Sequence, residues 1–296
     1  MLLNFELYKV FYQVASNLSF SKAAEKLFIS QSAVSQNIKN LEKELKTKLF
    51  IRSTKNVELT QAGSLLLKHI EPAFNLIENG EKSLREINDL KRGEIHIGAN
   101  DTIAKDYLLP YLKKFHQLYP EIQIQITNRT SSTCIELLKQ NKVDLIISNL
   151  PNSKITNKMQ IKPIFSFKDI FIAADQFKEL KTKKLKLKEL TNYPFLSLER
   201  KTTSQQFLEK HLNKLGIEIE AAVELGSVDL LIEMTKIGLG IAVVPEYCLN
   251  LKQEKLFEVK FKEKLPARKL AVISNKNIPL TKAAKKLIEI LNEKFI

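Results

Sequence analysis

A polar stretch near the N-terminus carries the clearest chemical pattern in the sequence. In QSAVSQNIKNLEKEL, residues 31–45, apolar side chains recur at intervals of four, three and four and form one stripe of a helix over about 32–45: Val34, Ile38, Leu41 and Leu45. The other side chains point away from that stripe and can form hydrogen bonds: Ser32, Ser35, Gln36, Lys39 and Asn40. Such groups can read base edges in the major groove of DNA, where glutamine pairs bidentately with adenine. On spacing alone, a solvated helix face explains the pattern too.

Side chains that could perform catalysis or hold a metal are scattered. The four histidines have no metal-ligand spacing and no obvious carboxylate or cysteine partner: His69, His96, His116 and His211. Cys134 lies near a predicted helix start, where a thiolate can be stabilised, but Cys248 is far away in the sequence and packing is the simpler role. Gly238 and Gly240 do not form the GxGxxG pattern of nucleotide sites. The sequence predicts no catalytic residues, no metal site and no cofactor.

The elements around the polar stretch predict a helix-turn-helix followed by a wing. Residues 4–17 place apolar side chains on one helical face, and a second helix begins at Ser21 as its N-cap, with two small alanines on its inner face. The short turn ISQ then leads into the polar helix. After that helix, FIRSTKNVEL predicts a hairpin with a polar turn at residues 53–56. This order of elements is typical of winged DNA-binding domains.

A long helix is predicted over about 61–90, with Thr60 as its N-cap. Its apolar and small residues alternate at intervals of four and three: Leu66, Ile70, Ala73, Ile77, Gly80, Leu84 and Ile87. A heptad seam sustained for about three repeats is typical of a two-stranded coiled coil. The alternative is a core helix of a globular domain. The position between two compositionally different regions favours a dimerisation linker.

From RGEIHIGAN onward, strands alternate with helices. Strands are predicted at 94–99, 123–128, 143–148, 170–173, 195–198, 222–225, 241–244 and 269–274, and helices at about 107–118, 132–141, 203–215, 228–237 and 281–294. The alternation predicts an α/β region with mainly parallel sheets. Its length of about 200 residues suits two lobes.

Composition and charge set the broad class. The chain has 296 residues and is 44% hydrophobic, so it can form folded cores. We expect a cytoplasmic protein with no membrane partner, because the first ten residues lack a basic leader and no stretch reaches the roughly 18 apolar residues of a membrane span. Residues 1–60 carry only four of the fourteen net positive charges, and residues 93–296 carry ten. The charge therefore permits DNA binding without locating it.

The region 11–63 resembles the winged helix-turn-helix of LysR-type transcriptional regulators. The matching positions are Phe20, Ala23, Ala24, Leu27, Gln31, Ser32, Val34, Ser35, Ile38, Leu41, Glu42, Leu45, Leu49, Phe50, Arg52, Leu59, Thr60 and Gly63. Further along, LLPYLKKFHQLYP, VDLIISN and IGLGIAVVPE resemble the effector-binding domain of the same family. The resemblance implies homodimers, often homotetramers, and double-stranded DNA sites with partial dyad symmetry. RNA polymerase is a further candidate partner.

Residue by residue, the resemblance implies the DNA contacts. The positions that match the recognition helix are Gln31, Ser32, Ser35 and Gln36, and those that match the wing are Arg52 and Lys55. Ser21 and Lys39 complete the candidate DNA-binding set. Many family members have arginine after the serine of the recognition helix, whereas this chain has Gln36. We therefore expect an adenine contact rather than a guanine contact at that position.

The resemblance also implies an effector cleft between two lobes, as in periplasmic binding proteins. Strand ends and helix starts line such clefts, and free backbone N–H groups there attract anions. These positions carry Asn100, Thr102, Thr130, Ser131, Thr202, Ser204 and Ser227. The set suits a small carboxylate, although serine and threonine also cap helices throughout proteins. Asp101 would repel an anion, so we expect its side chain to face outward.

Together, these observations predict a winged helix-turn-helix domain over 1–60, a linker helix over 61–92 and an α/β two-lobed, periplasmic-binding-protein-like effector domain over 93–296. Lobe one would comprise about 93–162 and 266–296, and lobe two about 163–265. The predicted function is sequence-specific transcriptional regulation controlled by a small, anionic effector. The alternatives are a ligand-independent DNA-binding protein with a vestigial cleft, and a two-lobed α/β enzyme with an appended interaction domain.

Overall fold

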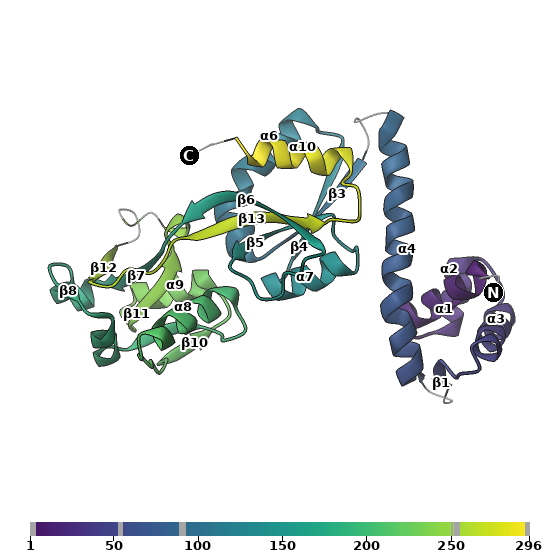
Figure 1. Cartoon of the computed structure of the whole chain (residues 1–296), viewed down its shortest axis with the longest axis horizontal. Helices are drawn as coiled ribbons and strands as arrows, with labels where there is room; N and C mark the ends of the chain where they lie inside the picture. Colours follow the sequence, from purple (N-terminus) through teal and green to yellow (C-terminus); the bar gives the residue numbers. More distant parts are fainter. Residues whose placement is uncertain (1–3, 53–55, 89–92, 250, 252–254, 294–296) are drawn as a thin grey trace. The chain divides into compact units, whose positions relative to one another are not determined.

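The computed structural model describes residues 4–52, 56–88, 93–249, 251 and 255–293 (Figure 1). The chain forms two compact units, residues 1–81 and 82–296, and each is described here by itself. No helix in these described ranges has the length and apolar character needed to cross a membrane.

The N-terminal unit contains three helices and a hairpin. The helices are α1 (Phe5–Asn17), α2 (Phe20–Leu27) and α3 (Gln31–Glu44), and the hairpin pairs β1 (Phe50–Arg52) with β2 (Val57–Leu59) in antiparallel fashion. Ser19, not Ser21, is the N-cap of α2, because its hydroxyl accepts a hydrogen bond from the Lys22 backbone N–H. Ser30 caps α3 in the same way, through the Ala33 N–H. The expectation that Ser21 caps the second helix is therefore wrong, and Ser21 lies inside α2.

One apolar cluster holds these elements together. The three helices contribute fully buried side chains to it: Phe11, Val14, Ala23, Val34, Ile38 and Leu41. The apolar stripe predicted for α3 thus faces the core, with Leu45 partly buried at its end. The opposite face of α3 is left for solvent or a partner.

The long helix α4 (Gln61–Asn88) covers this core with its first half. Thr60 caps it by accepting from the Gly63 N–H at 2.9 Å. Leu66 and Ile70 pack against the winged core, and Phe74 stacks on Tyr12 of α1 with ring centroids 5.1 Å apart. Farther along, Ile77 is 44% exposed and Leu84 is 65% exposed. The two halves of the predicted seam therefore differ. Leu66 and Ile70 pack inside the chain, whereas Ile77 and Leu84 are exposed and open to a partner.

The first sheet of the second unit has the strand order β4-β3-β5-β13-β6. These strands are β3 (Gly93–Ala99), β4 (Ile122–Asn128), β5 (Leu145–Leu150), β6 (Met159–Phe167) and β13 (Arg268–Asn275). Two helices, α6 (Leu109–Leu118) and α10 (Lys282–Leu291), cover one face, and α7 (Ser131–Lys139) covers the other (Figure 1). The short α5 (Asp101–Ile103) and the π-helix η1 (Ala104–Leu108) lead from β3 into α6.

The second sheet has the strand order β10-β9-β11-β7-β12-β8. Its strands are β7 (Asp169–Ala174), β8 (Lys184–Leu185), β9 (Phe195–Leu198), β10 (Val223–Leu225), β11 (Ile241–Pro245) and β12 (Leu256–Phe261). The helices α8 (Thr203–Lys214) and α9 (Val228–Lys236) pack on opposite faces. Short 3-10 helices complete the lobe: η2 (Asp175–Leu180), η3 (Leu187–Asn192) and η4 (Glu246–Cys248).

Both sheets are mainly parallel, as expected, and each contains one strand that runs against the others. In the first sheet, β13 runs antiparallel to both β5 and β6, and in the second, β7 runs antiparallel to both β11 and β12. The reason is the path of the chain. It leaves the first sheet through β6, enters the second through β7, and returns through β13.

The crossing between the lobes lies later in the sequence than expected. Residues 163–167 stay paired with β13 in the first sheet, so the chain crosses at Lys168 rather than before residue 163.

A buried ion pair lies at this crossing. Arg268 is 1% exposed, and its Nη1 donates to Asp169 Oδ2 at 2.9 Å. The Arg268 guanidinium also lies over the rings of Phe167 and Phe207. One buried ion pair thus ties the start of β13 to the start of β7.

Candidate functional site

The outward face of α3 presents hydrogen-bonding side chains. Gln31, Ser32, Gln36 and Lys39 are exposed, and Ser35 is half-buried. Ser21 Oγ donates to Gln31 Oε1 at 3.2 Å, which links α2 to the start of α3. The α3 side chains therefore point away from the buried stripe of that helix, and Ser21 lies beside the first of them, Gln31.

Two of these candidate side chains already have polar contacts within the chain. The Gln36 amide donates to Asn40 Oδ1 at 3.0 Å, so Gln36 would exchange this contact for one with a base. The hydroxyl oxygens of Ser32 and Ser30 lie 2.8 Å apart. Arg52 ends β1 at the wing, and Lys55 lies outside the described residues.

A cavity of 380 Å³ lies in the second unit, lined by residues from both lobes. All seven effector candidates line it: Asn100, Thr102, Thr130, Ser131, Thr202, Ser204 and Ser227. The structure thus brings together residues that come from four separate segments of the sequence. Sequence reasoning missed several further lining residues: Asn128, Arg129, Asn149, Lys201 and Asp229.

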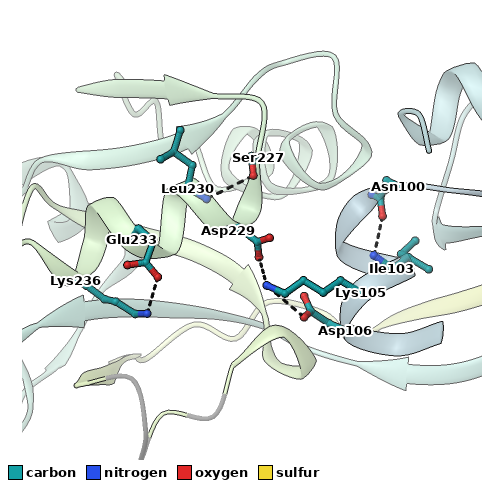
Figure 2. A network of polar contacts seen from close by, with 9 residues as sticks. All are labelled: Asn100, Ile103, Lys105, Asp106, Ser227, Asp229, Leu230, Glu233 and Lys236. Atoms are coloured by element: carbon teal, nitrogen blue, oxygen red, sulfur yellow. Dashed lines mark hydrogen bonds and ion pairs between the residues drawn. The ribbon is translucent and has the colours of Figure 1, made fainter. Parts of the chain in front are cut away.

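Four of the seven candidates cap helices whose first turns face the cavity. The Asn100 side chain accepts from the Ile103 N–H at 2.9 Å, and Ser227 Oγ accepts from the Leu230 N–H at 3.4 Å (Figure 2). Thr130 and Thr202 cap α7 and α8 in the same manner. A capping hydroxyl uses a lone pair as acceptor and keeps its own O–H as a donor, and the capping Asn100 amide keeps its NH₂ group as a donor. These residues can therefore hold the helix starts and still donate to a ligand.

Ser204 differs from these four residues because its hydroxyl oxygen accepts a hydrogen bond from a buried arginine. Arg268 Nη1 donates to Ser204 Oγ at 3.1 Å. Because the oxygen accepts this bond, the serine hydrogen is available to an acceptor in the cavity. Ser131 is 5% exposed at the start of α7.

Asp101 lines the cavity, so the expectation that it faces outward is wrong. Its carboxylate accepts a hydrogen bond from the Asn128 side-chain amide. Asp101 is also the first residue of α5, where the unsatisfied N–H groups of a helix start favour a negative charge. The contact with Asn128 joins the ends of β3 and β4, which a reading of each segment alone does not reveal.

An ion pair joins the two lobes beside the cavity. Lys105 of η1 lies 2.8 Å from Asp229 of α9, and 3.9 Å from its neighbour Asp106 (Figure 2). Burial raises the pKa of Asp106, and the nearby Lys105 only partly offsets this effect. Asp229 lines the cavity, so this pair forms part of its rim.

The cysteines and histidines do not form a reactive centre in the parts of the chain described. Burial raises the pKa of the Cys134 thiol to about 11, and burial also raises that of Cys248, so both thiols are protonated at neutral pH. His96 Nε2 lies 3.2 Å from Glu94, a carboxylate partner that the sequence reading overlooked. Within the described ranges, no group of three histidine, cysteine or acidic residues could hold a metal ion.

Comparisons with known proteins agree with this architecture. Residues 5–64 match the family described as bacterial regulatory helix-turn-helix protein, lysR family, and residues 88–296 match the LysR substrate binding domain. A probable RuBisCO transcriptional regulator from Cyanidium caldarium is 30% identical over 264 residues, which cover 87% of this chain and 83% of that protein.

Two solved structures share the fold. A full-length OxyR variant from Pseudomonas aeruginosa has a TM-score of 0.74 at 20% identity and covers 98% of this chain and 95% of that one. Full-length CbnR, solved with its target DNA, has a TM-score of 0.66 at 18% identity, with 98% and 99% covered. The chain therefore belongs to the LysR family of bacterial transcriptional regulators and combines a DNA-binding helix-turn-helix domain with a substrate-binding domain.

Proposed function

We propose that this regulator acts in the cytoplasm, binds specific DNA through α3 and the wing, and responds to a small metabolite that presents an anionic group. The observation that carries the proposal is the common cavity of the seven hydrogen-bonding residues, four of which cap helix starts. Helix starts and hydroxyl donors suit an anionic group. The proposed divisions are a DNA-binding domain over 1–60, a linker over 61–92 and an effector domain over 93–296.

The proposed regulation is a shift between arrangements of a homo-oligomer, a dimer or a tetramer. A ligand can change DNA binding only if it binds one arrangement better than another. The cavity is lined from both lobes, so a ligand there would favour one lobe spacing. The exposed half of the α4 seam supports self-association. RNA polymerase is a proposed partner at the promoter, and no catalytic step is proposed.

Support for the DNA contact comes from the helix face and from one relative. CbnR was crystallised with its target DNA, and its chain shares this fold. In this chain, Ser32 and Gln36 are exposed on the face opposite the core stripe. The proposed DNA target is a duplex site with partial dyad symmetry, because a two-fold symmetric dimer matches two half-sites.

The test uses full-length protein in a thermal-shift and calorimetry screen of small carboxylates, amino acids, and sulfur and nitrogen metabolites. A hit should bind Thr102→Val more weakly, since a lost hydroxyl contact costs about 0.5–1.5 kcal/mol. Thr182→Val, an exposed change outside the cavity, is the matched control. Both variants should bind promoter DNA without ligand. A vestigial cleft would be favoured by either of two results. In one, every hit binds Thr102→Val as tightly as the parent; in the other, no compound changes DNA binding.

A further inference from the structure

The charged side chains that line the cavity are four: Asp101, Arg129, Lys201 and Asp229. Two of them have counter-ions that lie outside the lining. Lys201 Nζ is 2.6 Å from Glu199 Oε2, and Asp229 Oδ1 is 2.8 Å from Lys105 Nζ. These two charges are therefore already compensated by the protein.

The other two charges, Asp101 and Arg129, have no ion-pair partner among the residues that the structure describes. Both form a hydrogen bond with Asn128, which also lines the cavity. The Asn128 amide donates to Asp101 Oδ1, and Arg129 Nη1 donates to the Asn128 carbonyl oxygen at 2.7 Å. Asn128 thus holds one carboxylate and one guanidinium beside the cavity without pairing them with each other.

A buried amide adds to the acceptor side of the cavity. Asn149 lines the cavity and is 3% exposed, and its Oδ1 has no hydrogen-bond partner in the described part of the chain. A buried acceptor without a donor is unfavourable, because it has lost its hydrogen bonds with water and gained none in return. A ligand that brings a hydrogen-bond donor to this position would relieve that cost.

The donor side of the cavity consists of the capped helix starts, the serine and threonine hydroxyls, and Arg129. These groups suit a carboxylate. Asp101 can only accept hydrogen bonds when it is ionised, so it suits a cationic or donating group. A dianion would place a negative group near the uncompensated Asp101, whereas a simple amine would leave Arg129 and the helix starts unused.

From this arrangement we infer that the effector is a zwitterion of the α-amino acid type. Its carboxylate binds the helix starts and Arg129, and its ammonium group faces Asp101 and the Asn149 amide oxygen. The inference rests on the proposed function, because it names the ligand class of the same cavity. It goes beyond that proposal by requiring a protonated amine as well as an anionic group.

The experiment compares matched ligands on the full-length protein. Calorimetry is carried out with the proteinogenic L-amino acids, each beside its 2-oxo acid, and with sulfate, phosphate and citrate. We expect at least one amino acid to bind at least tenfold more tightly than its 2-oxo acid. In Asp101→Asn that preference should fall below threefold, because the carboxylate that pairs with the ammonium is gone. In Arg129→Gln both members of the pair should lose affinity.

Asp175→Asn, an exposed change in lobe two outside the cavity, is the matched control and should keep the parent's preference. The inference is overturned if the 2-oxo acids, sulfate, phosphate or citrate bind as tightly as every amino acid, or if the preference persists in Asp101→Asn. In those cases the cavity still binds a regulator and the proposed function stands. Absence of binding by every compound in all three series overturns both.

Discussion

Arg268 and Asp169 form a buried ion pair where the chain passes between the two lobes, with 2.9 Å between Nη1 and Oδ2. Arg268 is 1% exposed and Asp169 is 8% exposed. Arg268 opens β13 of the first sheet, and Asp169 opens β7 of the second. The same guanidinium holds Ser204 of the cavity, so one side chain connects the lobe crossing to the candidate effector site.

Replacing Arg268 by methionine should destabilise the effector domain by about 3–5 kcal/mol, because it leaves the buried Asp169 charge without its partner. Chemical denaturation followed by circular dichroism measures this loss. Arg268→Met combined with Asp169→Leu should recover part of the stability, since replacing both charges removes the unpaired one. A double variant that is less stable than Arg268→Met would contradict this account.

A second buried charge anchors the wing. Glu42 of α3 is 5% exposed and accepts hydrogen bonds from the Leu49 N–H at 2.9 Å and from Lys48 Nζ at 2.9 Å. Burial acts to raise the pKa of this carboxyl, but the hydrogen bonds from Leu49, Lys48 and Phe50 outweigh it and hold the pKa below its ordinary value of 4.5. The folded N-terminal unit thus favours the ionised form.

A lowered folded-state pKa gives stability that is present above the ordinary value of 4.5 and is lost as the pH falls through the folded-state pKa. Glu42→Gln should therefore cost about 1–3 kcal/mol at neutral pH and less in acid. Denaturation of both proteins across acidic pH measures the difference. Glu44→Gln, an exposed change on the same helix, should leave the pH dependence as in the parent. A pH-independent cost of Glu42→Gln would contradict the assignment.

Much of the fold could be predicted because apolar periodicity dominates it. The α3 stripe of Val34, Ile38 and Leu41 is fully buried, as its spacing indicated. The strand β6 was missed although its sequence MQIKPIFSF partly alternates between apolar and polar residues, because Pro163 inside the run argues against a strand. The strand β8 has two residues, too few for any pattern.

Residues that line the cavity could be predicted where a helix cap follows the end of a strand. Thr130 and Ser227 follow strands and cap helices, and both face the cavity. Contacts between distant segments could not be predicted from any one segment. Asp101 is bound by Asn128, and Lys105 pairs with Asp229, which is 124 positions away. Such partners become visible only when the sheets bring their strand ends together.

The recognition helix gives a prediction about DNA. Ser35→Ala combined with Gln36→Ala should reduce specific binding by about 1–3 kcal/mol, the worth of one good base contact. The fold should persist, because the buried stripe of α3 is unchanged. Fluorescence anisotropy with promoter and scrambled duplexes measures affinity and preference, and Gln13→Ala on α1 is the control. Unchanged sequence preference in the double variant would reject this face as the DNA reader.

The final prediction concerns the exposed half of the α4 seam. Ile77 and Leu84 are one heptad apart and lie on the surface of the chain, whereas Leu66 and Ile70 already pack on the winged core. Ile77→Glu should place like charges face to face in a two-chain seam and should weaken self-association at least tenfold, because a desolvated charge at such a position is costly. Sedimentation velocity across a concentration series measures this change. Leu65→Glu introduces the same charge at a 60% exposed position outside the seam and should leave association unchanged. Equal association of Ile77→Glu and the parent would show that the chains meet through a different surface, since the apolar half of α4 would then carry no contact between them.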